Sequence, residues 1–361
     1  MQKITVGAAD AGQRLDKFLQ KYLKEAEKGF LYKMLRKKNI TLNGKKADGS
    51  EKLEAADEIC FYFSNETFEK FRGVRVVSGG VLSTPSAAGS AQKSPAKAAP
   101  AASKLSIVYE DDHVLFADKP AGLLTQKAKP EDISLNDIIA SYLEQSGKTS
   151  GLTFSAGTAN RLDRNTSGLV AAGKTLAGQQ LLAFLFKERL IEKYYWCIVS
   201  GTAESPLHLK QYYRKDEATN TAQLLDKPLP GTQTAELYAV PLARLDEGFT
   251  LLRVRLITGR THQIRAQLSA AGHPVLGDGK YGDAAVNRAF SARHGYPLRH
   301  QLLHAKEMIV SSPAEEMAER SGLSGEVLRE WLSLTGKTIS APLPASFASC
   351  LRFLGGDEDG K

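Results

Sequence analysis

The chain has 361 residues, is 42% hydrophobic and 24% charged, and carries a formal net charge of +8. This composition excludes collagen, a wholly disordered chain and a small disulfide scaffold, and the length predicts two or three domains. The three cysteines, Cys60, Cys197 and Cys350, are odd in number and far apart, which favours reduced thiols in a cytoplasmic protein.

The first residues show no apolar run behind a basic start, and nowhere do eighteen apolar residues follow one another. The sequence therefore predicts neither a signal peptide nor a membrane span. Apolar residues at helical spacing over residues 15–23 and 31–35 predict two helices. Residues 40–42 alternate into Asn43-Gly44, a tight-turn signal, and residues 57–63 predict a closing strand.

Positive charge gathers in the first 104 residues of the chain. The second predicted helix and the turn after it carry much of it, as Lys33, Arg36, Lys37, Lys38 and Lys45. A cluster of this kind favours a polyanion as partner. A solvated lysine-rich surface would show the same charge, and it is the simpler reading for any one of these side chains.

Residues 78–104 consist of Ala, Ser, Gly, Pro and Lys with a few aliphatic, Thr and Gln residues, and they contain no aromatic side chain. Such a segment cannot bury enough apolar surface to offset the entropy of ordering. We therefore expect a flexible linker between two folded units, residues 1–77 and residues 105–361.

The second unit mixes strands and helices without a regular βαβ repeat. Strands are predicted at residues 107–109, 114–116, 169–172, 194–199 and 249–257, and a helix capped by Thr175 at residues 175–190. Thr261 is expected to cap another helix that ends at Gly272. This pattern predicts an α+β fold with a largely antiparallel sheet.

Asp163 lies between Arg161 and Arg164 in the turn-rich segment NRLDRNTSG. A carboxylate paired with a cation stays ionised and oriented, as a nucleophile or general base must be. A structural salt bridge would use the same residues, and spacing alone favours that alternative.

Two further segments carry polar groups that suit a site. In KYYWCIV, Lys193, Tyr195 and Cys197 share one face of a strand, although a tyrosine there is more often part of the core. In TGRTHQIR, Thr261 and Arg265 lie on one side of a first helical turn. That arrangement suits a phosphate or carboxylate, and equally ordinary helix capping.

Together these motifs resemble a known family. NRLDRNTSGLV, KYYWCIVSG, TGRTHQIRAQLSAAGHPVLGDGKYG and QLLHA are similar to the RluA family of pseudouridine synthases. Residues 12–63, with RLDKFL, a basic helix and the LNGK turn, resemble the RNA-binding domain named after ribosomal protein S-four. The resemblance implies an isomerase that detaches uracil from its ribose, rotates it and rejoins it through carbon 5, with no cofactor and no metal.

The same resemblance assigns roles residue by residue. Asp163 matches the catalytic aspartate, Arg265 the basic residue that pairs with it, and Tyr195 the tyrosine that stacks on the uracil. Arg161 matches the arginine that helps to extrude the nucleotide, and Arg260 is taken as a further RNA contact. Asn160 and Asn165 stand where His and Asp are common in the family.

The expected partner is RNA, and the basic N-terminal module favours large-subunit ribosomal RNA. A tRNA-modifying enzyme and a non-catalytic RNA-binding assembly factor are the alternatives. Without a self-pairing surface in the sequence, we expect a monomer.

Overall fold

The computed structural model describes residues 1–73, 105–146, 151–216, 219, 221–312, 325–358 and 360. The predicted linker, residues 78–104, and the end of the predicted N-terminal unit, residues 74–77, lie outside this part of the chain. Within it, every helix is too short or too polar to cross a lipid bilayer. The thiols of Cys60, Cys197 and Cys350 are buried and unbridged.

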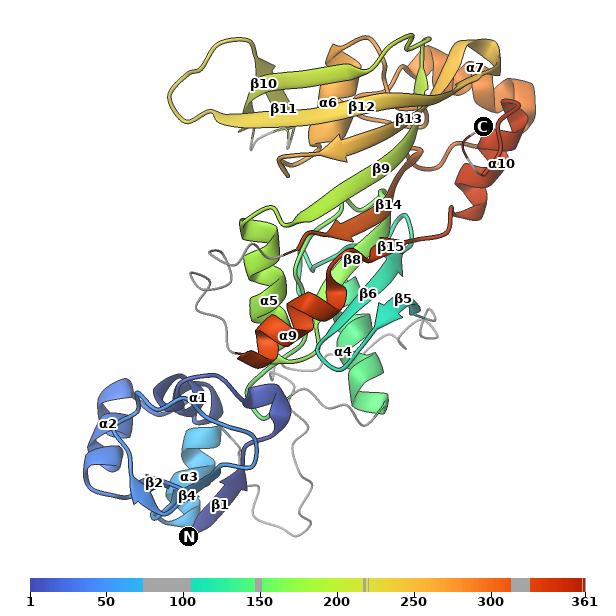
Figure 1. Cartoon of the computed structure of the whole chain (residues 1–361). Helices are drawn as coiled ribbons and strands as arrows, with labels where there is room; N and C mark the ends of the chain where they lie inside the picture. The colour runs from blue at the N-terminus through green and yellow to red at the C-terminus, as the bar shows by residue number, and fades with distance from the viewer. Residues whose placement is uncertain are drawn as a thin grey trace.

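The N-terminal residues form a small four-stranded sheet with helices packed on it (Figure 1). The strand order is β1-β4-β2-β3, and Phe18 and Phe61 are fully buried in its core. Asn43 and Gly44 take positive φ angles of 51° and 71°, which confirms the tight turn between β2 and β3. The elements are β1 (Gln2–Thr5), η1 (Ala8–Asp10), α1 (Leu15–Tyr22), α2 (Lys28–Arg36), β2 (Ile40–Leu42), β3 (Lys45–Lys46), β4 (Glu58–Phe61) and α3 (Asn65–Arg72).

The remaining strands form one eleven-stranded sheet with the main order β11-β10-β12-β13-β9-β14-β8-β6-β5, while β15 pairs with β14 and β7 with β8. Among the described pairs only β8 with β14 is parallel, so the predicted α+β fold with a largely antiparallel sheet is confirmed. The strands are β5 (Ser106–Glu110), β6 (Val114–Lys119), β7 (Gly157–Thr158), β8 (Ser167–Gly173), β9 (Ile191–Ser200), β10 (Leu207–Asp216), β11 (Thr221–Leu225), β12 (Gln233–Leu245), β13 (Phe249–Leu256), β14 (Leu303–Val310) and β15 (Thr338–Ser340).

Helices cover both faces of this sheet. One face packs against α4 and α6, through residues such as Ile139 and Leu268. The opposite face packs against α5 and α9 near one end and against α7 and α10 near the other. These elements are α4 (Leu135–Gln145), α5 (Leu176–Lys187), η2 (Asp246–Gly248), α6 (Gln263–Ala270), α7 (Ala284–His294), α9 (Gly325–Leu334) and α10 (Ala345–Phe353).

The ends of two predicted helices turned out differently. Thr175 caps α5, its hydroxyl accepting from Gly178 N at 3.1 Å, as expected. Thr261 does not cap α6, so that prediction was wrong. The N-cap is His262, whose φ of 56° places it in the left-handed region and whose side chain makes no capping hydrogen bond. Gly272, with φ of 83°, follows the last turn of α6 as predicted.

The parallel contact between β8 and β14 positions the site. These strands meet at only two residue pairs, His304 with Ser167 and Ala305 with Gly168. The loop that precedes β8 carries the NRLDRNT segment, and α6 follows β13 two strands beyond β14. The turn-rich loop and the first turn of α6, far apart in sequence, therefore meet on one face of the sheet.

Candidate active site

Asp163 lies in the loop between β7 and β8. The neighbouring Leu162 is 9% exposed and belongs to the core, which anchors the loop. Thr125 holds the same residue on both sides: its hydroxyl accepts from Leu162 N at 3.1 Å and donates to Leu162 O at 3.0 Å. Thr166 N closes the turn on Asp163 O at 3.1 Å. With its backbone fixed, Asp163 presents a carboxylate that is 23% exposed.

A buried lysine supports this loop from below. Lys119, at the end of β6, is fully buried, and its ammonium donates to Pro120 O at 3.0 Å, Leu123 O at 2.8 Å and Arg164 O at 3.1 Å. Burial lowers the pKa of Lys119 to about 8, although the charges of Asp163 and Asp118 oppose the shift. The sequence analysis did not identify this residue, whose hydrogen bonds hold the loop.

Arg265, in the first turn of α6, joins two carboxylates. Its Nε and Nη2 donate to Asp278 at 2.7 and 2.8 Å, and its Nη1 donates to Asp163 at 2.9 Å. Burial alone would lower the pKa of Arg265, but the hydrogen bonds and charges of Asp278 and Asp163 raise it above its ordinary value. The guanidinium therefore remains charged, and its planar fork fixes the direction of the Asp163 carboxylate.

Asp278 was missed as a site residue, although it stands in the GDGKYG segment quoted for the resemblance. Its side chain is fully buried and also accepts from Lys280 N at 2.8 Å and Tyr281 N at 3.0 Å. Burial would raise its pKa, but these hydrogen bonds and the charge of Arg265 keep the pKa of Asp278 below its usual value. No helical or strand periodicity marks this residue, so only an assignment of the whole motif could have found it.

Tyr195 lies on β9, on the sheet face that carries α6. It is 6% exposed and lines the same cleft as Asp163. Burial, and then the nearby charge of Asp163, raise the pKa of Tyr195 well above its usual value. The phenol is therefore neutral at physiological pH, with an aromatic ring at the floor of the cleft.

His262 completes the wall beside Asp163. Its Nε2 is 4.0 Å from Asp163 Oδ2, and its Nδ1 is 3.1 Å from the hydroxyl of Tyr281. Burial, together with the charges of Arg265 and Lys280, lowers the pKa of His262 despite the opposing charges of Asp163 and Asp278. A neutral imidazole can accept or donate a hydrogen bond without competing with Arg265 for the carboxylate.

These groups surround a small cleft of about 90 Å³. Arg161 and Arg260 line it together with Asp163, Tyr195 and Arg265, so the structure brings together five residues that were expected at the site. Arg161 is exposed, and Arg260 is positioned by its Nε, which donates to Thr234 O at 3.2 Å. An anionic ligand that carries a ring would find arginines at the entrance and an aromatic floor below.

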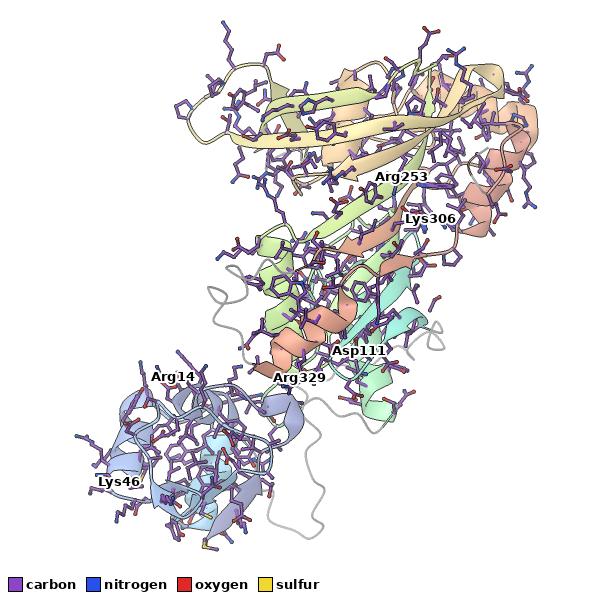
Figure 2. All side chains as sticks on the ribbon, viewed as in Figure 1. Arg14, Lys46, Asp111, Arg253, Lys306 and Arg329 are labelled. Atoms are coloured by element: carbon purple, nitrogen blue, oxygen red, sulfur yellow. The ribbon has the colours of Figure 1, made fainter. Side chains whose placement is uncertain are left out.

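The remaining predicted contacts lie elsewhere. The exposed cations of the N-terminal module are at the end of α2 and on the hairpin beside it, where Figure 2 labels Lys46. The cleft is not lined by any of the predicted cations of this module, which are Lys33, Arg36, Lys37, Lys38 and Lys45. Among the described residues, no group of three or more His, Cys, Asp or Glu side chains is arranged to hold a metal ion.

Comparisons with known proteins add to this geometry. Residues 113–270 match the family model described as RNA pseudouridylate synthase. The chain is 28% identical to ribosomal large subunit pseudouridine synthase C of Salmonella typhimurium, covering 97% of this chain and 96% of that protein. It is also 28% identical to an uncharacterised RNA pseudouridine synthase of Mycoplasma genitalium, covering 85% of this chain and 88% of that protein.

Solved structures share the fold. Human RNA pseudouridylate synthase domain containing 4 is similar with a TM-score of 0.52 at 20% identity, covering 69% of this chain and 93% of that one. Human RNA pseudouridylate synthase domain containing 1 is similar with a TM-score of 0.50 at 21% identity, covering 70% of this chain and 89% of that one.

Proposed function

Since residues 113–270 belong to the RNA pseudouridylate synthase family, we propose that this protein isomerises specific uridines to pseudouridine in large-subunit ribosomal RNA. The observation that carries the proposal is the Asp163 carboxylate, which Arg265 orients and which lines one cleft together with Tyr195. Relatives named as ribosomal large subunit pseudouridine synthases match almost the whole chain, which supports ribosomal RNA as the substrate.

The reaction breaks the bond from C1′ of the ribose to N1 of the uracil and forms a bond from C1′ to C5. The proton on C5 leaves, N1 ends with a proton, and the net composition is unchanged. Asp163 is the catalytic carboxylate that acts on the nucleoside, because Arg265 holds it in one direction at 2.9 Å and the cleft leaves it partly open to a ligand. Asp278 is a positioning residue, since it acts through Arg265.

Tyr195 supplies a surface for the uracil ring. Its raised pKa makes a phenolate base unfavourable near pH 7, so stacking is the role that its surroundings support best. The detached uracil must rotate without leaving, and a flat aromatic floor lets it slide while the walls retain it.

The target uridine has to leave its stack to reach Asp163. A cleft of about 90 Å³ cannot admit a paired helix, and extrusion of a nucleotide costs a few kcal/mol. Arg161 is exposed at the entrance, where its long side chain can take the place that the base vacates and its charge can meet the phosphates on either side.

The N-terminal module supports a large, folded RNA as the substrate. Its cations on α2 and the β2–β3 hairpin are exposed and do not line the catalytic cleft, so the chain offers phosphate contacts at two separate places. We assign this S-four-like module to RNA binding, and the cations Lys33, Arg36, Lys37, Lys38 and Lys45 to contacts with the phosphate backbone.

Site-resolved mapping of pseudouridine in total RNA tests the proposal. Cells that lack the gene are complemented with the wild type, with Asp163→Asn, or with Asp226→Asn as a matched control at an exposed aspartate. We expect discrete large-subunit rRNA sites to disappear, and to return with the wild type and Asp226→Asn only. Sites lost only from tRNA would refute the rRNA assignment, and no lost site would refute the activity.

Binding of purified Asp163→Asn to RNA separates chemistry from folding. The carboxamide keeps the size of the carboxylate, so RNA affinity should stay within about threefold of the wild type while isomerisation falls by at least about a thousandfold. Loss of both affinity and activity in a variant that melts like the wild type would contradict the role given to Asp163.

A further inference from the structure

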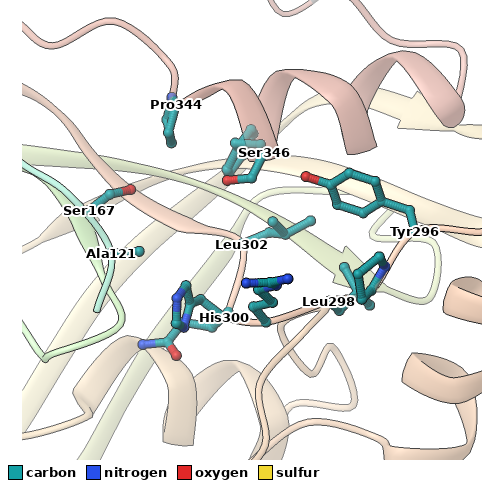
Figure 3. Close-up of a pocket in the computed structure, with 12 residues that line it drawn as sticks. Ala121, Ser167, Tyr296, Leu298, His300, Leu302, Pro344 and Ser346 are labelled. Carbon is teal, nitrogen blue, oxygen red and sulfur yellow. The ribbon is translucent and has the colours of Figure 1, made fainter. Parts of the chain in front are cut away.

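A second cavity of about 290 Å³ is lined in part by Ser167, which follows the loop that carries Asp163 (Figure 3). Its walls come from four places: Ala121 after β6, Ser167 at the start of β8, the segment from Tyr296 to Leu302, and the start of α10. Figure 3 shows Tyr296 at one end, Ala121 and Ser167 at the other, and Ser346 between them. The catalytic mechanism uses none of these residues.

Hydrogen bonds join this cavity to the catalytic loop. Gln301, in its wall, donates to Thr166 Oγ1 at 3.1 Å, and Gly122 N, beside Ala121, donates to Arg164 O at 2.8 Å. Ser167 is four residues from Asp163, which bounds the backbone separation at about 14 Å. With stacked nucleotides rising about 3.4 Å each, an RNA strand anchored at Asp163 reaches the cavity within about four nucleotides.

The walls have the composition of a ligand pocket. Leu298, Leu302, Pro344 and Phe347 make them largely apolar, and the aromatic ring of Tyr296 stands at one end. A few polar groups converge on this surface, which is the usual pattern where a flat organic ring binds. The volume is about three times that of the catalytic cleft.

Two of the polar groups are unpaired within the described part of the chain. The Nδ1 atom of His300 is buried and has no hydrogen-bond partner there. Burial and the charges of Arg299 and Lys119 lower the pKa of His300, so its imidazole is neutral and presents one donor and one acceptor, as the edge of a nucleobase requires. Arg299 is exposed, and no described residue forms an ion pair with it.

We propose that this cavity receives an unpaired nucleotide of the substrate RNA that neighbours the target uridine, its base between the apolar walls and its phosphate against Arg299. The inference rests on the proposed function, since it takes the ligand to be the RNA on which Asp163 acts. It adds a second binding pocket for a base, and with it a source of sequence or structure preference that the catalytic cleft does not supply.

A thermodynamic cycle tests the proposal. The probe is a labelled RNA stem-loop that carries the uridine found by the mapping experiment, with a single abasic nucleotide placed in turn at each of four positions on either side. The variants are Ala121→Leu and Ser346→Leu, which narrow the cavity from two different elements, and Arg299→Ala. Ala285→Leu and Arg288→Ala, at exposed positions on α7, are the matched controls. Affinity is measured by fluorescence anisotropy.

For the wild type, we expect one abasic position, or two adjacent ones, to raise the Kd about tenfold, as the loss of a stacked base does. Each narrowing variant should raise the Kd of the intact RNA by a similar factor, and the abasic nucleotide should then cause no further loss. kcat should stay within about twofold, because the contact is made equally in the ground state and the transition state. The controls should match the wild type.

Two results would overturn the proposal. In the first, the loss of affinity caused by a narrowing variant and the loss caused by the abasic nucleotide add up at every position. In the second, the narrowing variants melt like the wild type and bind the RNA with unchanged affinity. If the wild type isomerises the stem-loop while either result is found, only the cavity proposal fails. If the wild type binds the stem-loop without isomerising it, the cycle still decides the cavity, and the mapping experiment alone decides the proposed function. If mapping yields no site, or the RNA is not bound, both proposals are refuted.

Discussion

The side chains of the site illustrate how charge is kept inside this protein. Arg265 is 8% exposed and Asp278 is fully buried, and a buried charge is tolerated only where partners satisfy it. Asp278 uses the Nε and Nη2 edge of the guanidinium, which leaves Nη1 for Asp163. The Asp163 carboxylate is therefore oriented by a cation that a second carboxylate, Asp278, holds in place.

Asp278→Asn should test this support. The substitution leaves the Arg265 charge with one carboxylate, so we expect the free energy of unfolding to fall by about 3–5 kcal/mol. We also expect kcat to fall by more than KM rises, because Arg265 no longer directs Asp163. Urea unfolding and steady-state kinetics measure the two effects, with Asp226→Asn as the control. A kcat equal to that of the wild type in the folded variant would contradict the positioning role.

His304 gives a prediction about pH. It is fully buried, its Nδ1 is 2.9 Å from Ser167 Oγ, and burial, then the charge of Lys306, lower its pKa to about 3. Between about pH 6.5 and pH 3 the unfolded state binds the proton and the folded state does not. The contribution of His304 to stability is therefore complete above pH 6.5 and is lost as the pH falls towards 3.

The measurement compares the wild type with His304→Gln. Burial raises the pKa of Asp118 to about 6 against the charges of Lys119 and Lys306. The contribution of Asp118 to stability is therefore lost as the pH rises from about 3.8, its unfolded pKa, to about 6, which is opposite to the effect of His304. Because both proteins contain Asp118, the difference between their free energies of unfolding isolates His304. We expect the advantage of the wild type to shrink from pH 7 to pH 4. A difference that does not change with pH would contradict the prediction.

At the scale of elements, the active site depends on how closely β8 approaches β14. Gly168 has a φ of 109°, and a Cβ built on it would lie 2.3 Å from Ala305 O. Such a conformation favours glycine, and the missing side chain lets the two backbones touch. The loop that carries Asp163 enters β8 at this point, so the contact also sets the height of the loop above the sheet.

Gly168→Ala should therefore destabilise the protein more than a comparable substitution elsewhere. Gly272 also has a positive φ, of 83°, but its Cβ would meet nothing within 4 Å, so Gly272→Ala loses only the conformational preference, about 1–3 kcal/mol. Gly168→Ala adds a backbone collision to that cost. Thermal unfolding of the two variants makes the comparison, and equal losses of stability would show that β8 and β14 can separate without penalty.

At the scale of the whole molecule, the N-terminal module contacts the second unit directly. Asp10, fully buried at the end of η1, accepts hydrogen bonds from Thr153 N at 3.0 Å, Thr153 Oγ1 at 2.7 Å and Phe154 N at 2.9 Å, and also from Leu152 N. Gln13 Nε2 donates to Thr153 Oγ1 at 2.8 Å. The cations of the module are thus held in a defined relation to the catalytic unit, so both can contact one large RNA.

The salt dependence of RNA binding tests that division of labour. Replacing Lys33, Arg36 and Lys37 by alanine should weaken RNA binding. The slope of log Kd against the logarithm of the salt concentration should fall by about 2–3, because three phosphate contacts no longer release counterions. The charge-conserving variant Lys33→Arg/Arg36→Lys/Lys37→Arg is the control. A slope that stays at the wild-type value would refute the RNA-binding role of α2.

Short-range patterns in the sequence determined much of this molecule. The Asn43-Gly44 turn, the Thr175 cap and the strand over residues 194–199 follow from residues a few positions apart, because local backbone preferences and side-chain periodicity set them. The resemblance of the motifs to a known family likewise predicted Asp163, Tyr195 and Arg265 as site residues, and the structure brings them into one cleft.

Contacts between distant segments were decided only by the tertiary structure. The Arg265 to Asp163 hydrogen bond joins residues 102 positions apart, and Lys119 reaches a carbonyl 45 positions away. Nothing in the local pattern around Lys119 or Asp278 distinguishes a buried clamp from a surface charge. The left-handed His262 and the cavity lined by Ser167 and Tyr296 also arise where separate elements meet, since packing there overrides local preference. The sequence thus predicts which chemistry is present, and packing between remote segments determines how its groups are held.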